Sequence, residues 1–180
     1  MLNVGMSHFQ SYTRSKADKF GLSIIDLLYV SNLKGGNASI TEPEPALSKK
    51  LKRYDKKLRE LHSLIAGKTL RNLSCRERDV LKARAIDFLG LTQRKEAEIR
   101  GFDPSYASAL LSAYFPEVTP ILDRRVLNGA RIPVRWRSNG QVANIISHYG
   151  QLIDAFHRVL SKERELSLRQ LDKRWFCASL

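Results

Sequence analysis

The sequence predicts an all-α fold on three observations. Apolar residues recur at steps of three and four along most segments, which is the period of a helix with one buried face. Residues that favour helix starts and stops bracket these segments. A strand-like alternation is missing, and residues 131–138 (RIPVRWRS) are the one candidate for an extended stretch. With 180 residues, 43% of them hydrophobic, we expect a single domain over residues 1–180, a compact helical bundle of two closely packed lobes.

The first predicted helix covers residues 20–33 (FGLSIIDLLYVSNL). It is apolar around most of its circumference, so we expect it to be central and buried. Glycines and prolines in residues 35–45 prevent its continuation and make this stretch the only plausible seam. Residues 45–67 then favour an amphipathic helix with a strongly basic outer face. Its inward positions are Leu47, Leu51, Tyr54, Leu58, Leu61 and Ile65.

Three helices are predicted over residues 74–115. The first, residues 74–90, opens with a capping box from Ser74 to Glu77. A shorter, polar helix begins at Thr92 and ends near residue 101. Asp103 as N-cap and Pro104 at the first helical position then start a helix that ends near residue 115. The inward positions expected for residues 74–90 are Val80, Leu81, Ile86 and Leu89.

The two helices of residues 92–115 are separated by so short a turn that we expect a helical hairpin. Small side chains on its second helix allow close approach of a neighbouring backbone, and its N-terminus offers backbone N–H groups that suit a phosphate oxygen. Beyond it we expect a short helix over residues 123–130, a long helix over residues 140–161 broken near Gly150, and a last helix capped by Ser167. Leu168, Leu171, Trp175 and Phe176 of this last helix are expected to pack on the core.

The charge balance indicates an extended anionic partner. Lys and Arg number 31 against 18 Asp and Glu, which gives a formal net charge of +13 and a sequence pI near 10.0. Nucleic acid is the first expectation and an acidic membrane surface the second. A basic, ribosome-like protein without chemistry is the plain alternative.

Cysteine usage and hydropathy exclude several classes. The two cysteines, Cys75 and Cys177, lie far apart without a CxxC spacing or a histidine at ligand spacing, so we expect no metal site and no disulfide framework. The first residues lack the apolar core and cleavage site of a signal peptide. No apolar run approaches the roughly 20 residues of a membrane helix. We therefore expect a cytoplasmic protein that does not enter a membrane.

One acidic residue stands out within residues 116–129. Asp123 follows a proline and two apolar residues and precedes Arg124 and Arg125. Aspartate is a favoured N-cap, so the plain interpretation is that Asp123 caps the next helix. The alternative is a carboxylate that stabilises a developing cation.

The stretch of about thirty residues from Ile99 to Gly129 resembles the helix-hairpin-helix DNA glycosylases of the endonuclease III superfamily, nearest in pattern to 8-oxoguanine glycosylase-like members. The matching residues are Ile99, Gly101, Asp103, Ala107, Ser108, Pro120, Asp123, Arg125 and Val126. The resemblance implies that Asp123 is the catalytic carboxylate and that the hairpin contacts DNA through Gly101 and Ser105. A weaker match around residues 31–40 implies that Asn37 fills the hole left by a flipped base.

Two departures from the family pattern affect the expected chemistry. Ser105 lies 18 residues before Asp123, where lyase members carry a catalytic lysine, and serine cannot form an imine with the sugar. We therefore expect no lyase activity. Asp103 replaces the second hairpin glycine, which leaves two alternatives for this carboxylate: it opposes a phosphate, or it caps the helix.

Five more residues are candidates for DNA binding. Arg124 and Arg125 can contact phosphates or pair with Asp123. Arg135 and Arg137 flank Trp136 in a basic loop whose aromatic ring can stack on a base; the alternative is a tryptophan packed on the core.

Together these features predict a monofunctional DNA glycosylase. It would hydrolyse the N-glycosidic bond of a flipped damaged or modified base in double-stranded DNA and leave an abasic site, in repair or in defence against phage DNA with modified bases. Such an enzyme needs no cofactor, and no obligatory protein partner is evident. The alternatives are a non-catalytic DNA-binding module of the same fold and a basic helical RNA-binding protein.

Overall fold

The computed structural model describes residues 2–36 and 40–178, and the regular secondary structure of these residues is entirely helical. The all-α prediction is therefore confirmed. The described α-helices are α1 (Leu2–Ser15), α2 (Ile24–Leu33), α3 (Glu44–Ile65), α4 (Cys75–Gly90), α5 (Pro104–Tyr114), α6 (Arg124–Gly129), α7 (Tyr149–Lys162) and α8 (Leu168–Cys177). Short 3-10 turns are η1 (Leu70–Asn72), η2 (Leu91–Gln93) and η3 (Ile145–His148).

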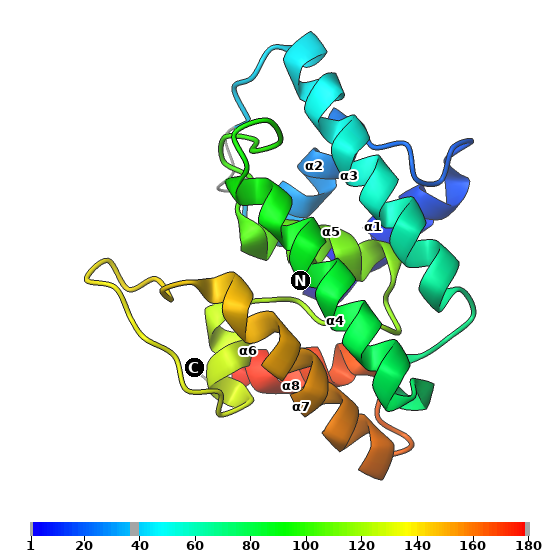
Figure 1. Cartoon of the computed structure of the whole chain (residues 1–180), viewed down its shortest axis with the longest axis vertical. Helices are drawn as coiled ribbons and strands as arrows, with labels where there is room; N and C mark the ends of the chain where they lie inside the picture. The colour runs from blue at the N-terminus through cyan, green and yellow to red at the C-terminus, as the bar shows by residue number, and fades with distance from the viewer. Residues whose placement is uncertain (1, 37–39, 179–180) are drawn as a thin grey trace.

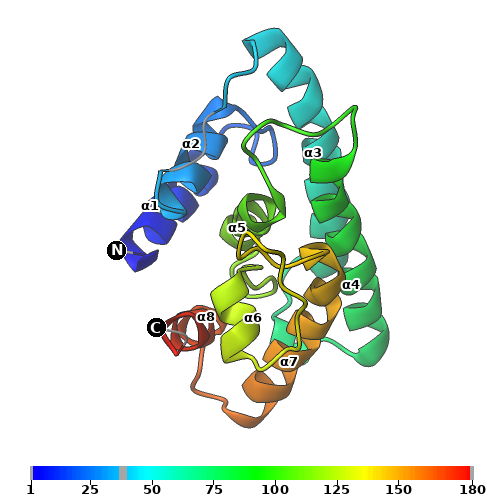
Figure 2. The same cartoon turned by 90° about the vertical axis from the view of Figure 1, so that its left-hand side faces the viewer.

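The helices form two groups around a central one (Figures 1 and 2). Helices α1 and α2 pack on each other at one end of the molecule, and α6, α7 and α8 gather at the other. Helices α3 and α4 run side by side along one edge. Helix α5 lies between the groups and contacts α1, α2 and α4, and its residues 107–114 are all buried. The small residues of α5 thus allow it to serve as the shared centre of the fold.

Local sequence signals set most helix boundaries as predicted. All six inward positions of α3 are buried, at most 4% exposed. The capping box of Ser74 and Glu77 is present at α4, and Ser167 caps α8 with Gln170 as its partner. Asp103 caps α5, and Pro104 occupies its first position.

The predicted helix over residues 92–101 is wrong. These residues form η2, a series of turns and an isolated β-bridge between Ile99 and Phe102. Two backbone carbonyls here are used by side chains of α3: the Tyr54 hydroxyl donates to Ala97 O at 3.2 Å, and Lys50 Nζ donates to Glu98 O at 2.6 Å. With few apolar residues to bury, this polar segment is held better by such contacts than by a helix. The hairpin predicted over residues 92–115 therefore has only its second helix.

Two smaller expectations also need correction. Helix α2 packs on α1 and α5 by one face only, so Ile24, Ile25 and Leu28 are 41–54% exposed and the helix is not central. Val80 of α4 is 37% exposed, and Ala85 and Phe88 fill the buried positions instead.

The segment predicted as one helix over residues 140–161 also differs. Its helical part begins at Ile145 with η3, which leads directly into α7 at Tyr149. Gly150 is the second residue of α7 and does not interrupt that helix. Helix α1 was not predicted from its sequence.

Candidate functional site

Asp123 lies at the N-terminus of α6, on backbone that three side chains hold in place. Ser108 Oγ accepts a hydrogen bond from Leu122 N at 2.8 Å, and Ser112 Oγ donates to Thr119 O at 3.0 Å. The buried Tyr149 hydroxyl donates to Pro120 O at 2.8 Å. The small residues of α5 thus fix the approach to Asp123 through their hydroxyl groups.

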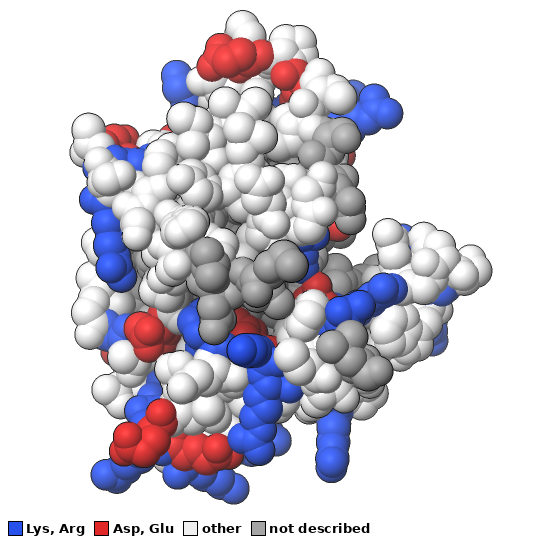
Figure 3. Space-filling model, turned by 180° about the vertical axis from the view of Figure 1, so that it is seen from behind, with Lys and Arg blue, Asp and Glu red and all other residues white. Residues whose placement is uncertain are grey.

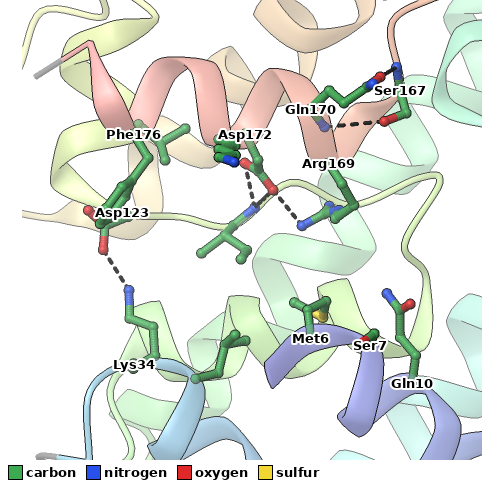
Figure 4. Close-up of a pocket in the computed structure, with 14 residues that line it drawn as sticks. Met6, Ser7, Gln10, Lys34, Asp123, Ser167, Arg169, Gln170, Asp172 and Phe176 are labelled. Carbon is green, nitrogen blue, oxygen red and sulfur yellow. Dashed lines mark hydrogen bonds and ion pairs between the residues drawn. The ribbon is translucent and has the colours of Figure 1, made fainter. Parts of the chain in front are cut away.

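The carboxylate of Asp123 has two partners. Its Oδ1 accepts from Arg125 N at 2.9 Å, which is the N-cap bond expected from the sequence. Its Oδ2 lies 2.5 Å from Lys34 Nζ, which comes from the end of α2 (Figure 4). The ion pair is largely shielded from water, with the Lys34 and Asp123 side chains 14% and 17% exposed.

Asp123 is ionised at neutral pH despite its burial. Burial alone would raise its pKa, but the Lys34 ammonium, the Arg125 backbone N–H and the Arg125 charge together hold the pKa below the ordinary aspartate value. The site therefore keeps a negative charge in a region of low solvent exposure. Such a charge acts more strongly on a nearby cation than it would in water.

Asp123 and Lys34 lie at one end of a pocket of about 650 Å³ (Figure 4). Helix α1 forms one wall through Met6, Ser7 and Gln10, and α8 forms the opposite wall. The volume falls within the range of about 300–1,000 Å³ typical of small-molecule sites. The pocket next to Asp123 is therefore large enough for a small-molecule ligand.

A second carboxylate, Asp172 of α8, lines the same pocket and is 7% exposed. Burial raises its pKa to about 6, against the opposing effect of the Arg169 guanidinium and the Ile121 N–H. Arg169 pairs with Asp172 and also donates to Thr119 O at 2.5 Å and Pro116 O at 3.3 Å. The pair thus clamps the backbone that leads to Asp123.

Sequence reasoning missed Lys34, Arg169 and Asp172. Asp172 lies four residues after the buried Leu168, so its position on the inward stripe of α8 was a usable signal. Lys34 had no such signal, because its partner is 89 residues away in the chain.

The two arginines after Asp123 point to different neighbours. Arg124 Nη1 donates to Gly140 O at 2.9 Å, toward the loop of residues 131–143. The Arg125 guanidinium carbon lies 4.9 Å from the centre of the Phe176 ring, and Phe176 lines the pocket.

The loop of residues 131–143 carries the other basic candidates. Arg135 and Arg137 are exposed, and Trp136 is 51% exposed, so the interpretation of Trp136 as a core residue is wrong.

Gly101 and Ser105 lie at the N-terminal end of α5 and are not part of the pocket lining. The Asp103 carboxylate accepts from Ser105 N at 2.8 Å and from Tyr106 N at 3.1 Å, so Asp103 caps α5. The N–H groups that a phosphate would use are therefore bonded to Asp103. DNA contact through Gly101 and Ser105 stays a prediction. Asn37 lies outside the described residues.

The surface that bears the pocket carries both signs of charge. Figure 3 shows Lys and Arg side chains over the lower part of this face and on the projecting segment at its side, with acidic side chains between them. Within residues 2–36 and 40–178, no group of three His, Cys, Asp or Glu residues could hold a metal ion. In the same part of the chain, every helix is too short or too polar to cross a bilayer.

Comparison with protein-family models, with curated proteins and with solved structures finds no match to this chain. The helix-hairpin-helix resemblance therefore remains a hypothesis that depends on the motif of residues 99–129.

Proposed function

We propose that this protein is a monofunctional DNA glycosylase with a helix-hairpin-helix glycosylase fold, which acts on double-stranded DNA in the cytoplasm. One observation carries the proposal: Asp123, a shielded carboxylate with a lowered pKa, lines a pocket of about 650 Å³. The net charge of +13 supports a polyanionic substrate. The released base would be damaged or modified, in repair or in defence against phage DNA.

The chemistry follows from what base removal requires. As the bond between the sugar C1′ and the base nitrogen breaks, positive charge develops on the sugar, and an ionised carboxylate nearby stabilises it. The base leaves with the electron pair of that bond, the oxygen of a water molecule bonds to C1′, and one proton of this water passes to the departing base. The base must first leave the stack and enter the pocket. In this proposal Asp123 supplies the charge, and the pocket receives the base.

Lys34 has two effects in this proposal. Before substrate enters, its ammonium group keeps Asp123 ionised. When the cationic sugar takes its place at the carboxylate, we expect Lys34 to turn toward a backbone phosphate of the flipped nucleotide. Ser105 offers no amine for imine formation, and an ammonium ion paired with a carboxylate is a poor nucleophile. The proposed enzyme therefore hydrolyses the glycosidic bond and leaves the DNA strand intact.

A non-catalytic DNA-binding module is the second candidate. The same ion pair favours it, because Lys34 offsets the charge of Asp123. The capping of α5 by Asp103 does not separate the two candidates, since both need DNA contact.

Abasic-site formation separates them. The substrates are unmodified, chemically damaged and phage-modified genomic DNAs, and the variants are Asp123→Asn and Asp79→Asn. Asparagine also caps helices, so Asp123→Asn removes the charge and keeps the fold; Asp79 is a control carboxylate, 70% exposed on α4. Abasic sites in one DNA with the wild type and Asp79→Asn, lost in Asp123→Asn, would support the glycosylase. Abasic sites in none of the DNAs, with duplex binding intact, would favour the binding module.

A further inference from the structure

A short hairpin projects from the body of the protein between α6 and α7 (Figures 1 and 3). We name residues 135–143 the hairpin arm. An isolated β-bridge pairs Trp136 with Val142, and Arg137 N donates to Gln141 O at 2.8 Å. The turn is made at Gly140, whose φ of +71° suits glycine. The arm is thus a defined structural element, held by its own backbone hydrogen bonds.

The arm presents an aromatic ring between two cations. Trp136 is 51% exposed, whereas the other tryptophan, Trp175, packs edge-on against Phe156 with ring centres 4.5 Å apart. Arg135 and Arg137 flank Trp136 and are exposed. Within the described part of the chain neither arginine forms an ion pair. A large ring kept in water between two unpaired cations is a feature that a ligand would explain.

The arm is fixed relative to the candidate site. Arg124, the residue after Asp123, donates through Nη1 to Gly140 O at 2.9 Å. On the other side Val142 is buried in the core, 7% exposed. The hairpin arm is therefore tied by a hydrogen bond to the residue that follows Asp123.

The ligand that fits is a polyanion with an accessible π-face. Paired bases inside a duplex show only their edges, but a flipped nucleotide leaves its partner and neighbours unstacked. Stacking of such a base on an aromatic side chain is a common and sequence-tolerant contact, and adjacent arginines suit the phosphates on either side.

We infer that the hairpin arm is a DNA contact in which Trp136 stacks on a base unstacked by flipping, while Arg135 and Arg137 contact the flanking phosphates. The inference rests on the proposed function, because that function supplies duplex DNA with one base removed from the stack. Anionic lipid is the other partner that tryptophan and arginine suit. DNA is favoured because the arm is tied to the residue next to Asp123.

The test is equilibrium binding to two labelled duplexes that differ at one position: fully paired, or carrying a tetrahydrofuran abasic analogue. Neither requires base release. We expect the wild type to prefer the abasic duplex, Trp136→Ala to lose about 5- to 150-fold of its affinity for that duplex, and Trp136→Phe to keep most of it. Because Trp136 is exposed, these variants should fold, and thermal melting checks this.

Arginine variants test the phosphate contacts. Arg135→Gln and Arg137→Gln should weaken binding to both duplexes alike, and each should lower the salt slope, −d log K/d log [salt], by about one. A salt slope unchanged from the wild type would overturn the assigned role of these arginines.

Three results would overturn the role of Trp136. One is equal affinity of Trp136→Ala and the wild type for the abasic duplex. Another is tighter, Trp136-dependent binding to a structured RNA hairpin than to either duplex at equal salt. The third uses Trp175→Phe, which leaves Trp136 as the sole tryptophan: a shift of its emission to shorter wavelength with phosphatidylserine vesicles, but no change of its emission with DNA, would assign the arm to lipid.

These outcomes are distinguishable from failure of the proposed function. Trp136-dependent binding without base release from any DNA would overturn the glycosylase and keep the arm. Base release with no effect of Trp136→Ala on binding would support the glycosylase and overturn the role assigned to the arm.

Discussion

Replacing Lys34 with methionine removes the ammonium group that lies 2.5 Å from Asp123 Oδ2 and keeps a side chain of similar length. Burial then becomes the dominant influence on the Asp123 carboxyl, and it raises the pKa. Without this opposite charge the ionised carboxylate is less favourable, so we expect Lys34→Met to raise the pKa of Asp123. Removing one partner of a fully buried ion pair typically costs about 3–5 kcal/mol, and we expect about 1–4 kcal/mol here because both side chains keep some contact with water.

The same free energy should appear in the pH dependence of stability. Since the folded-state pKa of Asp123 is depressed, its contribution is present above the unfolded pKa near 3.8 and is lost as pH falls through the lower, folded value. At neutral pH, Lys34→Met should therefore unfold more easily than the wild type, by about 1–4 kcal/mol. The difference should shrink as pH falls through the raised pKa of Asp123 in the variant, because the carboxyl becomes neutral there.

Two assays measure the shift. Carbon-13 NMR titration of the Asp123 carboxyl needs no substrate, and the acid limb of base release against pH should move to higher pH once a substrate is known. Lys173→Met is the matched control, because Lys173 also lines the pocket. An Asp123 pKa that is the same in Lys34→Met and in the wild type would refute the role assigned to the ion pair.

Three more predictions concern the same site. Burial raises the pKa of Asp172 to about 6, so the carboxyl stabilises the fold most below its unfolded pKa near 3.8, and about 3 kcal/mol is lost as pH rises from there through 6; about 2 kcal/mol of this loss falls between pH 4.5 and 7, and urea unfolding of Asp172→Asn at these two pH values should lack it. Ser108→Ala leaves Leu122 N without its acceptor and should cost about 1–3 kcal/mol, with slower base release at unchanged DNA affinity; equal melting curves would contradict it. Borohydride treatment with abasic DNA should give no covalent adduct, whereas an adduct lost in Lys34→Met would show that Lys34 acts as the amine.

The parts of the fold that the sequence predicted well are those that short-range chemistry decides. The inward face of α3 and the caps at Ser74, Asp103 and Ser167 depend on residues three or four positions apart, and all were found as expected. The helix predicted over residues 92–101 was wrong because Tyr54, from another helix, accounts for part of the hydrogen bonding of this segment.

The residues of the candidate site divide in the same way, into those that the local sequence indicates and those that only the folded protein brings together. Asp123 could be selected because its motif is contiguous, and its N-cap bond follows from the residues beside it. Its partner Lys34 could not be selected from the sequence, because pairing across 89 residues depends on how α2 and α6 meet in the folded protein. For Trp136 the sequence left two interpretations open, a core residue or an exposed ring, and its exposure of 51% decides for the second.

The first and last helices face each other across the pocket, with α1 on one wall and α8 on the other (Figures 2 and 4). A ribosome that has synthesised everything up to Lys162 has made Asp123, Lys34 and the α1 wall of the pocket, but not the opposite wall, which α8 supplies. During synthesis the pocket is therefore completed only when α8 emerges and docks. A chain that ends before α8 would keep Asp123 and Lys34 but would lack one wall of the pocket.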